Sequence, residues 1–90
     1  MRAFRAVVQG RVQGVGFRYF TKSHADTLNL KGWVRNLRDG TVELEAHGPV
    51  ETLERFMHLL ESGPIGSRVE KIDFQWLQEA QELETFEIRA

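Results

Sequence analysis

Residues 10–18 read Gly-Arg-Val-Gln-Gly-Val-Gly-Phe-Arg and lie between a β-like run and a helix-like run. Glycine has no Cβ and adopts positive φ, so a segment with three glycines lets successive N–H groups converge on one point. A helix that begins directly after the segment adds the positive end of its dipole. The segment therefore predicts a backbone site for an anion such as phosphate.

This glycine segment does not match the common nucleotide motifs. No Lys-Ser or Lys-Thr pair follows its last glycine, as a P-loop requires, and its glycine spacing differs from the dinucleotide fingerprint. The positive charge at its end is Arg18. We therefore expect Arg18, together with main-chain donors, to hold the anion.

A second informative segment, residues 32–40, reads Gly-Trp-Val-Arg-Asn-Leu-Arg-Asp-Gly. Together with residues 10–18 it closely resembles the acylphosphatases, small enzymes that hydrolyse carboxyl-phosphate anhydrides, and the resemblance extends over essentially all 90 residues. The resemblance implies that Arg18 is the phosphate-binding arginine and that Asn36 positions the attacking water.

Length and composition limit the kinds of protein this chain forms. Ninety residues make one small domain, 1–90, in which a deep cavity is not expected. No apolar run approaches the roughly 20 residues that cross a bilayer, and the first residues lack a signal-peptide core. There is no cysteine, hence no disulfide, thiolate nucleophile or Cys-ligated zinc. We expect a cytoplasmic monomer without a membrane partner.

Hydrophobic periodicity and turn residues predict the order of the elements. Asp39-Gly40 lies between two β-like runs and indicates a hairpin, and Asn29 lies where a left-handed residue ends a helix. The expected strands are 3–9, 31–37, 41–47, 68–76 and a short edge strand at 85–89; the helices are 17–28 and one that begins near Pro49 and stops at Gly63.

The order strand, helix, strand, strand, helix, strand is typical of an α+β ferredoxin-like sandwich, with an antiparallel sheet and two helices on one face. In this topology the first two strands run parallel and end at the same edge of the sheet. The glycine segment follows the first strand and Asn36 lies near the end of the second. Arg18 and Asn36 are therefore expected at one edge.

An acyl phosphate site needs a cradle for the phosphoryl oxygens, a charge that grips them and a group that aims water at phosphorus. We expect Arg18 to bind two oxygens, and Asn36 to orient the water without transferring a proton. The catalytic residues are thus Arg18 and Asn36, with no metal and no cofactor, and inorganic phosphate is expected to compete with substrate. The main-chain cradle is expected at Gln13, Gly14, Val15, Gly16, Phe17 and Arg18.

The remaining polar and aromatic candidates have simpler interpretations. His24, His47 and His58 show no metal-ligand spacing and are expected on the surface. Glu43 and Glu45 alternate with apolar residues, which predicts a half-buried strand with its acidic face in water. The aromatic side chains Phe17, Tyr19, Phe20 and Trp33 are expected to pack in the core or support the loop.

Two other functions compete with this hypothesis. RNA-recognition modules share the strand order, but they carry aromatic residues on the third strand, which here is acidic, so no nucleic-acid partner is expected. Acylphosphatase-like domains also open larger proteins that mature hydrogenases by handling carbamoyl phosphate. A non-catalytic or partner-dependent phosphate-binding module is therefore the alternative; it would need Arg18 but not Asn36.

Overall fold

A computed structural model of the chain describes residues 1–78 and 82–90. The elements follow the expected order, with boundaries within about two residues of those predicted from the sequence. The left-handed turn at Asn29, where φ is 58°, is also confirmed. The elements are β1 (Arg2–Arg11), α1 (Phe17–Thr27), β2 (Lys31–Asn36), β3 (Val42–Gly48), α2 (Val50–Ser62), β4 (Arg68–Trp76) and β5 (Phe86–Arg89).

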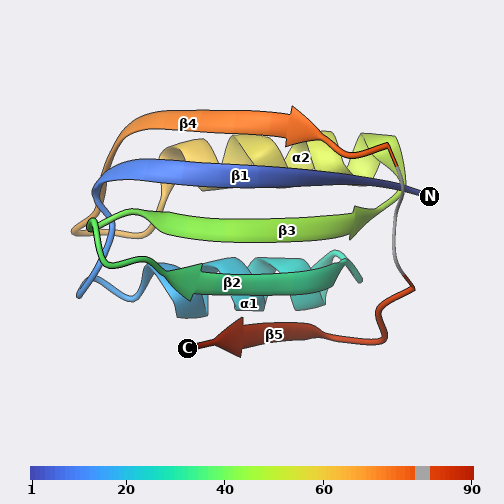
Figure 1. The fold of residues 1–90 in the computed structure, drawn as a ribbon, viewed down its shortest axis with the longest axis horizontal. Helices are drawn as coiled ribbons and strands as arrows, with labels where there is room; N and C mark the ends of the chain where they lie inside the picture. Colours follow the sequence, from blue (N-terminus) through green and yellow to red (C-terminus); the bar gives the residue numbers. More distant parts are fainter. Residues whose placement is uncertain (79–81) are drawn as a thin grey trace.

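The strands form one sheet in the order β4-β1-β3-β2-β5, and both helices cover the same face (Figure 1). The ferredoxin-like fold is confirmed, and the first four strands pair antiparallel. The expectation of a wholly antiparallel sheet is wrong, because β5 pairs parallel with β2. β5 starts at the end of the sheet where β4 stops, so it runs opposite to β4 and in the direction of β2.

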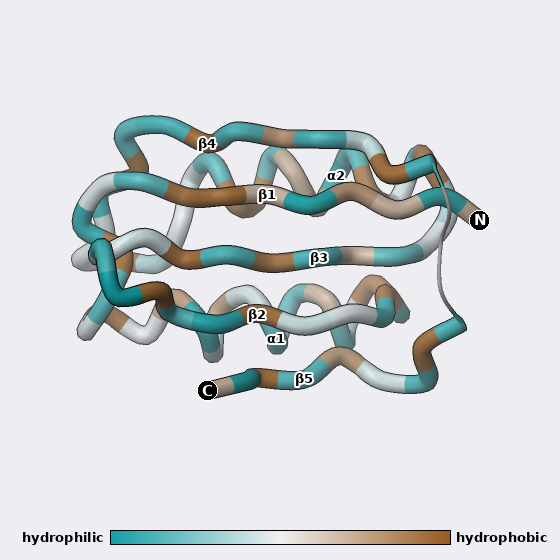
Figure 2. The backbone as a smooth tube through the Cα atoms, viewed as in Figure 1, coloured by the Kyte–Doolittle hydropathy of each residue, from teal (hydrophilic) through white to brown (hydrophobic). Residues whose placement is uncertain are grey.

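The core lies between the sheet and the helices, and aromatic rings connect its parts. Phe4 on β1 packs edge-on against Phe74 of β4, with ring centroids 5.4 Å apart, and lies 6.3 Å from Phe56 of α2. Phe56 in turn meets Phe86 of β5 at 6.2 Å, so this residue of α2 packs against both the inner strand β1 and the edge strand β5. Figure 2 shows the alternation of hydrophobic and hydrophilic residues along β3.

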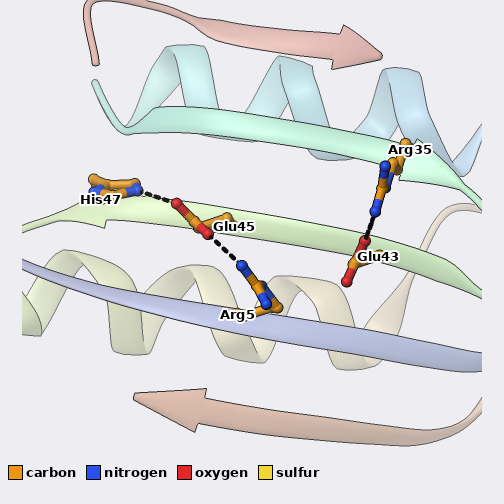
Figure 3. Close-up of polar contacts among 5 residues, drawn as sticks. All are labelled: Arg5, Arg35, Glu43, Glu45 and His47. Carbon is orange, nitrogen blue, oxygen red and sulfur yellow. Dashed lines mark hydrogen bonds and ion pairs between the residues drawn. The ribbon is translucent and has the colours of Figure 1, made fainter. Parts of the chain in front are cut away.

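The open face of the sheet carries a polar cluster on β3 that is not solvated as expected (Figure 3). Glu45 is only 7% exposed and His47 only 1% exposed, so the expected acidic, water-facing side of this strand and the surface position of His47 are both wrong. Glu45 accepts a hydrogen bond from Arg5 at 3.2 Å, and its other oxygen lies 2.7 Å from His47 Nε2.

Strand order explains this burial. β3 lies between β1 and β2, and the register sets Arg5 opposite Glu45 and Arg35 opposite Glu43. Arg35 Nη2 approaches Glu43 Oε1 to 2.7 Å. The carboxylates are therefore cross-strand partners of arginines, which stabilise adjacent strands when charges of opposite sign face each other.

The expected burial of Trp33 is confirmed, but its ring lies outside the main hydrophobic core. The guanidinium groups of Arg35 and Arg89 each lie 5.3 Å from the centroid of that ring. Cation–π contacts of this kind stabilise an aromatic ring beneath charged side chains. The open face of the sheet is thus held by charge pairs and one tryptophan.

Removal of the Glu45 carboxylate is expected to cost more stability than removal of the Glu43 carboxylate. Glu45→Ala leaves the enclosed Nε2 of His47 without its partner and should lower the free energy of unfolding by about 1–3 kcal/mol. Glu43→Ala breaks a pair whose arginine is half exposed, so its cost should be about 1 kcal/mol or less. Urea denaturation of both variants measures the difference, and equal losses would contradict the role assigned to the histidine contact.

Candidate functional site

The glycine segment forms the connection from β1 to α1, at the end of the sheet where β2 also stops (Figure 1). Gly14 and Gly16 have φ of 75° and 78°, values that L side chains rarely adopt. Gly16 is also the N-cap of α1, so no side chain caps the helix, and its first turn contains no acidic residue. The positive end of the helix therefore has neither a capping side chain nor an acidic residue in its own first turn.

A side chain ties this loop to the hairpin between β2 and β3. Gln13 Nε2 donates to the carbonyl oxygen of Leu37 at 2.7 Å and to that of Thr41 at 2.8 Å. The same hairpin is closed by a hydrogen bond from Leu37 N–H to the Thr41 carbonyl at 2.9 Å. Gln13 therefore fixes the distance between the loop and the end of β2. The sequence predicted only its main-chain N–H as a site group.

The hairpin is further ordered by Asp39. Its Oδ1 accepts hydrogen bonds from the Thr41 hydroxyl at 2.6 Å and from the Thr41 N–H at 3.0 Å. Both bonds lower the pKa of Asp39 below its ordinary value because they favour the charged carboxylate, and the bond from the Thr41 hydroxyl has the larger effect. The turn directly after Asn36 is thus held by local contacts.

Asn36 is the last residue of β2, where it pairs with Val42 of β3. Its Oδ1 is enclosed and accepts no hydrogen bond from any group in residues 1–78 and 82–90. Most buried side-chain oxygens have a partner, because leaving one unpaired costs free energy. An enclosed amide oxygen without a partner is therefore unusual, and it marks Asn36, which also lines a pocket, as a candidate functional residue.

The loop, the start of α1 and the end of β2 together enclose a pocket of about 100 Å³. Arg18 from the first turn of α1 and Asn36 from β2 both line it, so the two residues expected at one edge of the sheet do meet. No carboxylate within the described part of the chain forms an ion pair with Arg18. The lining residues are Val12, Gly14, Gly16, Phe17, Arg18, Tyr19 and Asn36.

Two residues expected in the cradle lie outside this lining, and two others belong to it. Gln13 supports the loop through its side chain, and Val15 packs against the hydrophobic core. Val12 and Tyr19, which the sequence did not assign to the site, contribute to the wall. Tyr19 is 72% exposed, so its expected position in the core or beneath the loop is wrong.

The exposure of Tyr19 follows from helix geometry. The buried residues of α1 are Phe17, Thr21 and Ala25, spaced four apart, and they define the face that packs on the sheet. Tyr19 lies two positions from that face and points outward. Helical spacing, applied to Tyr19 separately from its aromatic neighbours, would have predicted that its side chain is exposed.

The other candidate groups lie away from this pocket. His24 stacks edge-on with Phe20 at 4.5 Å on α1, and His58 is exposed on α2 beside Glu61, as expected for surface histidines on helices. Within residues 1–78 and 82–90, no group of three His, Cys, Asp or Glu residues could hold a metal ion. None of the helices there has the length and apolar character needed to cross a membrane.

Comparisons with known proteins agree with this geometry. The family model for acylphosphatases matches residues 4–88. An acylphosphatase from Salinibacter ruber is 48% identical over 84 residues, which cover 93% of this chain and 88% of the relative. The crystal structure of acylphosphatase from Bacillus subtilis superimposes with a TM-score of 0.98 at 40% identity and covers all of both chains.

A larger protein shares the fold over part of its length. Full-length HypF, in a phosphate- and nucleotide-bound form, matches 99% of this chain at 29% identity with a TM-score of 0.88, but the match covers only 12% of HypF. The curated relative and the Bacillus structure, in contrast, match this chain over nearly their whole length. The chain therefore belongs to the acylphosphatase family, and the resemblance seen in its two sequence motifs is confirmed.

Proposed function

We propose that this chain hydrolyses the carboxyl–phosphate bond of acyl phosphates in the pocket between the glycine loop and the end of β2, and that Arg18 and Asn36 are its catalytic residues. The observation that carries the proposal is that these two side chains, from different elements, line one small pocket at an uncapped helix N-terminus. A cation, main-chain donors and a neutral amide are the groups this reaction needs.

Arg18 binds the phosphoryl group. Its guanidinium presents a planar fork that matches two phosphoryl oxygens, and hydrogen bonds to charged groups contribute about 1.5–3 kcal/mol each. The dipole of α1 adds about 0.3–1 kcal/mol, with main-chain N–H groups between Gln13 and Arg18 directed at the remaining oxygens. The guanidinium therefore supplies most of the binding free energy.

Asn36 orients the attacking water. Its amide accepts a hydrogen bond from the water and directs the water oxygen at phosphorus, opposite the leaving carboxylate. Rotation about χ2 exchanges the amide oxygen and nitrogen, so the enclosed Oδ1 can be presented to the pocket. Because the amide does not titrate near neutral pH, its contribution is position rather than proton transfer.

The reaction balances without a further reactant. Water forms a bond to phosphorus as the bond between phosphorus and the acyl oxygen breaks, and the products are a carboxylate and inorganic phosphate. The water proton passes to a phosphoryl oxygen of the substrate itself. The leaving carboxylate is stable, so no general acid and no covalent nucleophile are needed.

We further propose that the enzyme acts as a monomer in the cytoplasm. Residues 12–36 by themselves supply the guanidinium, the amide and the main-chain donors that the proposed reaction uses. Inorganic phosphate, the product, occupies the same cradle and competes with substrate.

Hydrolysis is expected for an acyl phosphate but not for a simple phosphomonoester, and without added metal. In the proposed mechanism no group protonates the leaving group, so an alkoxide or phenoxide, which is far more basic than a carboxylate, is a poor leaving group in this pocket. Benzoyl phosphate and phenyl phosphate, each assayed with excess EDTA, provide the comparison. Activity that disappears with EDTA and returns with magnesium would contradict the proposed mechanism.

Replacement of the two catalytic residues should separate binding from chemistry. Arg18→Ala should lose phosphate affinity together with turnover, because the guanidinium holds the phosphoryl group in both ground state and transition state. Asn36→Ala should lower kcat by about 10²-fold or more and leave the inhibition constant of inorganic phosphate nearly unchanged. An Asn36→Ala enzyme with parental kcat would remove the water-positioning role and favour a module that only binds phosphate.

Loss of the Gln13 amide should loosen the site. Gln13→Leu keeps the size of the side chain but removes two hydrogen bonds to the hairpin, whose Leu37 and Thr41 carbonyls then retain only main-chain donors. We therefore expect kcat/KM to fall by about tenfold and the free energy of unfolding by about 1–3 kcal/mol. Gln75→Leu, at an exposed position on β4, is the matched control and should leave both quantities unchanged. Parental kinetics in Gln13→Leu would show that the hairpin contact does not position the loop.

A further inference from the structure

The pocket is small compared with sites that bury a whole ligand. Sites that surround a drug-sized ligand measure about 300–1,000 Å³, whereas this pocket measures about 100 Å³. Arg18, which we propose binds the phosphoryl group, lines the pocket itself. When the phosphoryl group occupies this space, an acyl group larger than acetyl must therefore extend beyond the pocket, along its rim.

Only one side chain of the rim offers an exposed apolar surface. Among the residues that line the pocket, Gly14 and Gly16 carry no side chain, and Arg18 and Asn36 present polar groups. Val12 and Phe17 are each 1% exposed and belong to the core. Tyr19 remains, with 72% of its surface accessible to solvent.

The surroundings of Tyr19 support a binding function rather than a structural one. Within the described part of the chain, large exposed hydrophobic side chains occur at Met1, Tyr19, Ile65 and Trp76, and Tyr19 alone among them lines the pocket. Its ring contributes little to folding because it lies off the buried face of α1. A tyrosine offers a large rigid contact area with few rotatable bonds, which suits it to ligand contact.

We propose that Tyr19 is a specificity-determining residue: its ring packs against the acyl group of the substrate and selects acyl phosphates with an aromatic or extended apolar acyl group. This inference rests on the proposed function, since it places the phosphoryl group beside Arg18. A planar benzoyl group presents a full ring face to Tyr19, whereas an acetyl group presents one methyl.

The test compares two substrates in the parent enzyme and three variants. In Tyr19→Ala, kcat/KM for benzoyl phosphate should fall by about fivefold or more, which corresponds to about 1 kcal/mol of lost transition-state binding. The value for acetyl phosphate and the inhibition constant of inorganic phosphate should stay within twofold of the parent. Tyr19→Phe retains the ring and should keep the preference for benzoyl phosphate. Ile65→Ala removes an apolar side chain that is fully exposed and lies outside the pocket lining, and it serves as the control.

Each contrary outcome has a distinct meaning. Equal losses for benzoyl and acetyl phosphate in Tyr19→Ala would overturn the proposal, because the residue would then act on the phosphoryl site. Unchanged selectivity would overturn it as well, since no acyl contact would exist. A parent enzyme that hydrolyses neither substrate would instead refute the proposed function, so the two failures are distinguishable.

Discussion

The position of β3 between β1 and β2 is the constraint on which the site depends. β3 pairs antiparallel with both neighbours, so β1 and β2 must run in the same direction and end at the same edge of the sheet. The loop after β1 carries Arg18 into the first turn of α1, and β2 ends at Asn36. Strand pairing thus brings together the Arg18 guanidinium and the Asn36 amide, which lie far apart in the sequence.

Charge distribution around this edge favours an anion. The contact that locks the loop to the hairpin uses the neutral amide of Gln13, which satisfies two carbonyls without introducing a charge. A carboxylate at the same position could not donate to those carbonyls when ionised, and it would reduce the positive potential near Arg18. The described carboxylates that pair with arginines lie elsewhere, such as Glu43 and Glu45 on the open face of the sheet (Figure 3).

Much of this arrangement could be predicted from the sequence because it depends on local rules. The glycines of residues 10–18, the hairpin at Asp39-Gly40 and the left-handed Asn29 each report backbone conformation directly. The convergence of Arg18 and Asn36 followed from the order of elements and the rule for parallel crossovers.

The errors concern properties that depend on neighbours in space. Alternation along β3 identified which residues share a face, but it could not show that Arg5 would shield Glu45 or that His47 would be enclosed. The direction of β5 depends on where a long connection ends, and the second role of Gln13 depends on a hairpin that lies 24 positions along the chain from it. Tyr19 was grouped with its aromatic neighbours although its position on the helix separates it from them.

The residues proposed to bind the phosphoryl group and the residue proposed to contact the acyl group lie in different environments. Arg18 and Asn36 are half buried and, in the proposed mechanism, act on a phosphoryl group that is the same in every acyl phosphate. Tyr19 is exposed to solvent at the position where we propose that substrates differ. Substitutions at exposed positions usually change stability by less than about 0.5 kcal/mol, so the residue at this position can change without loss of the fold. Tyr19 lies on α1, and the opposite face of this helix packs on the sheet. A single substitution at Tyr19 can therefore change the proposed preference among acyl groups and leave the phosphoryl site and the sheet intact.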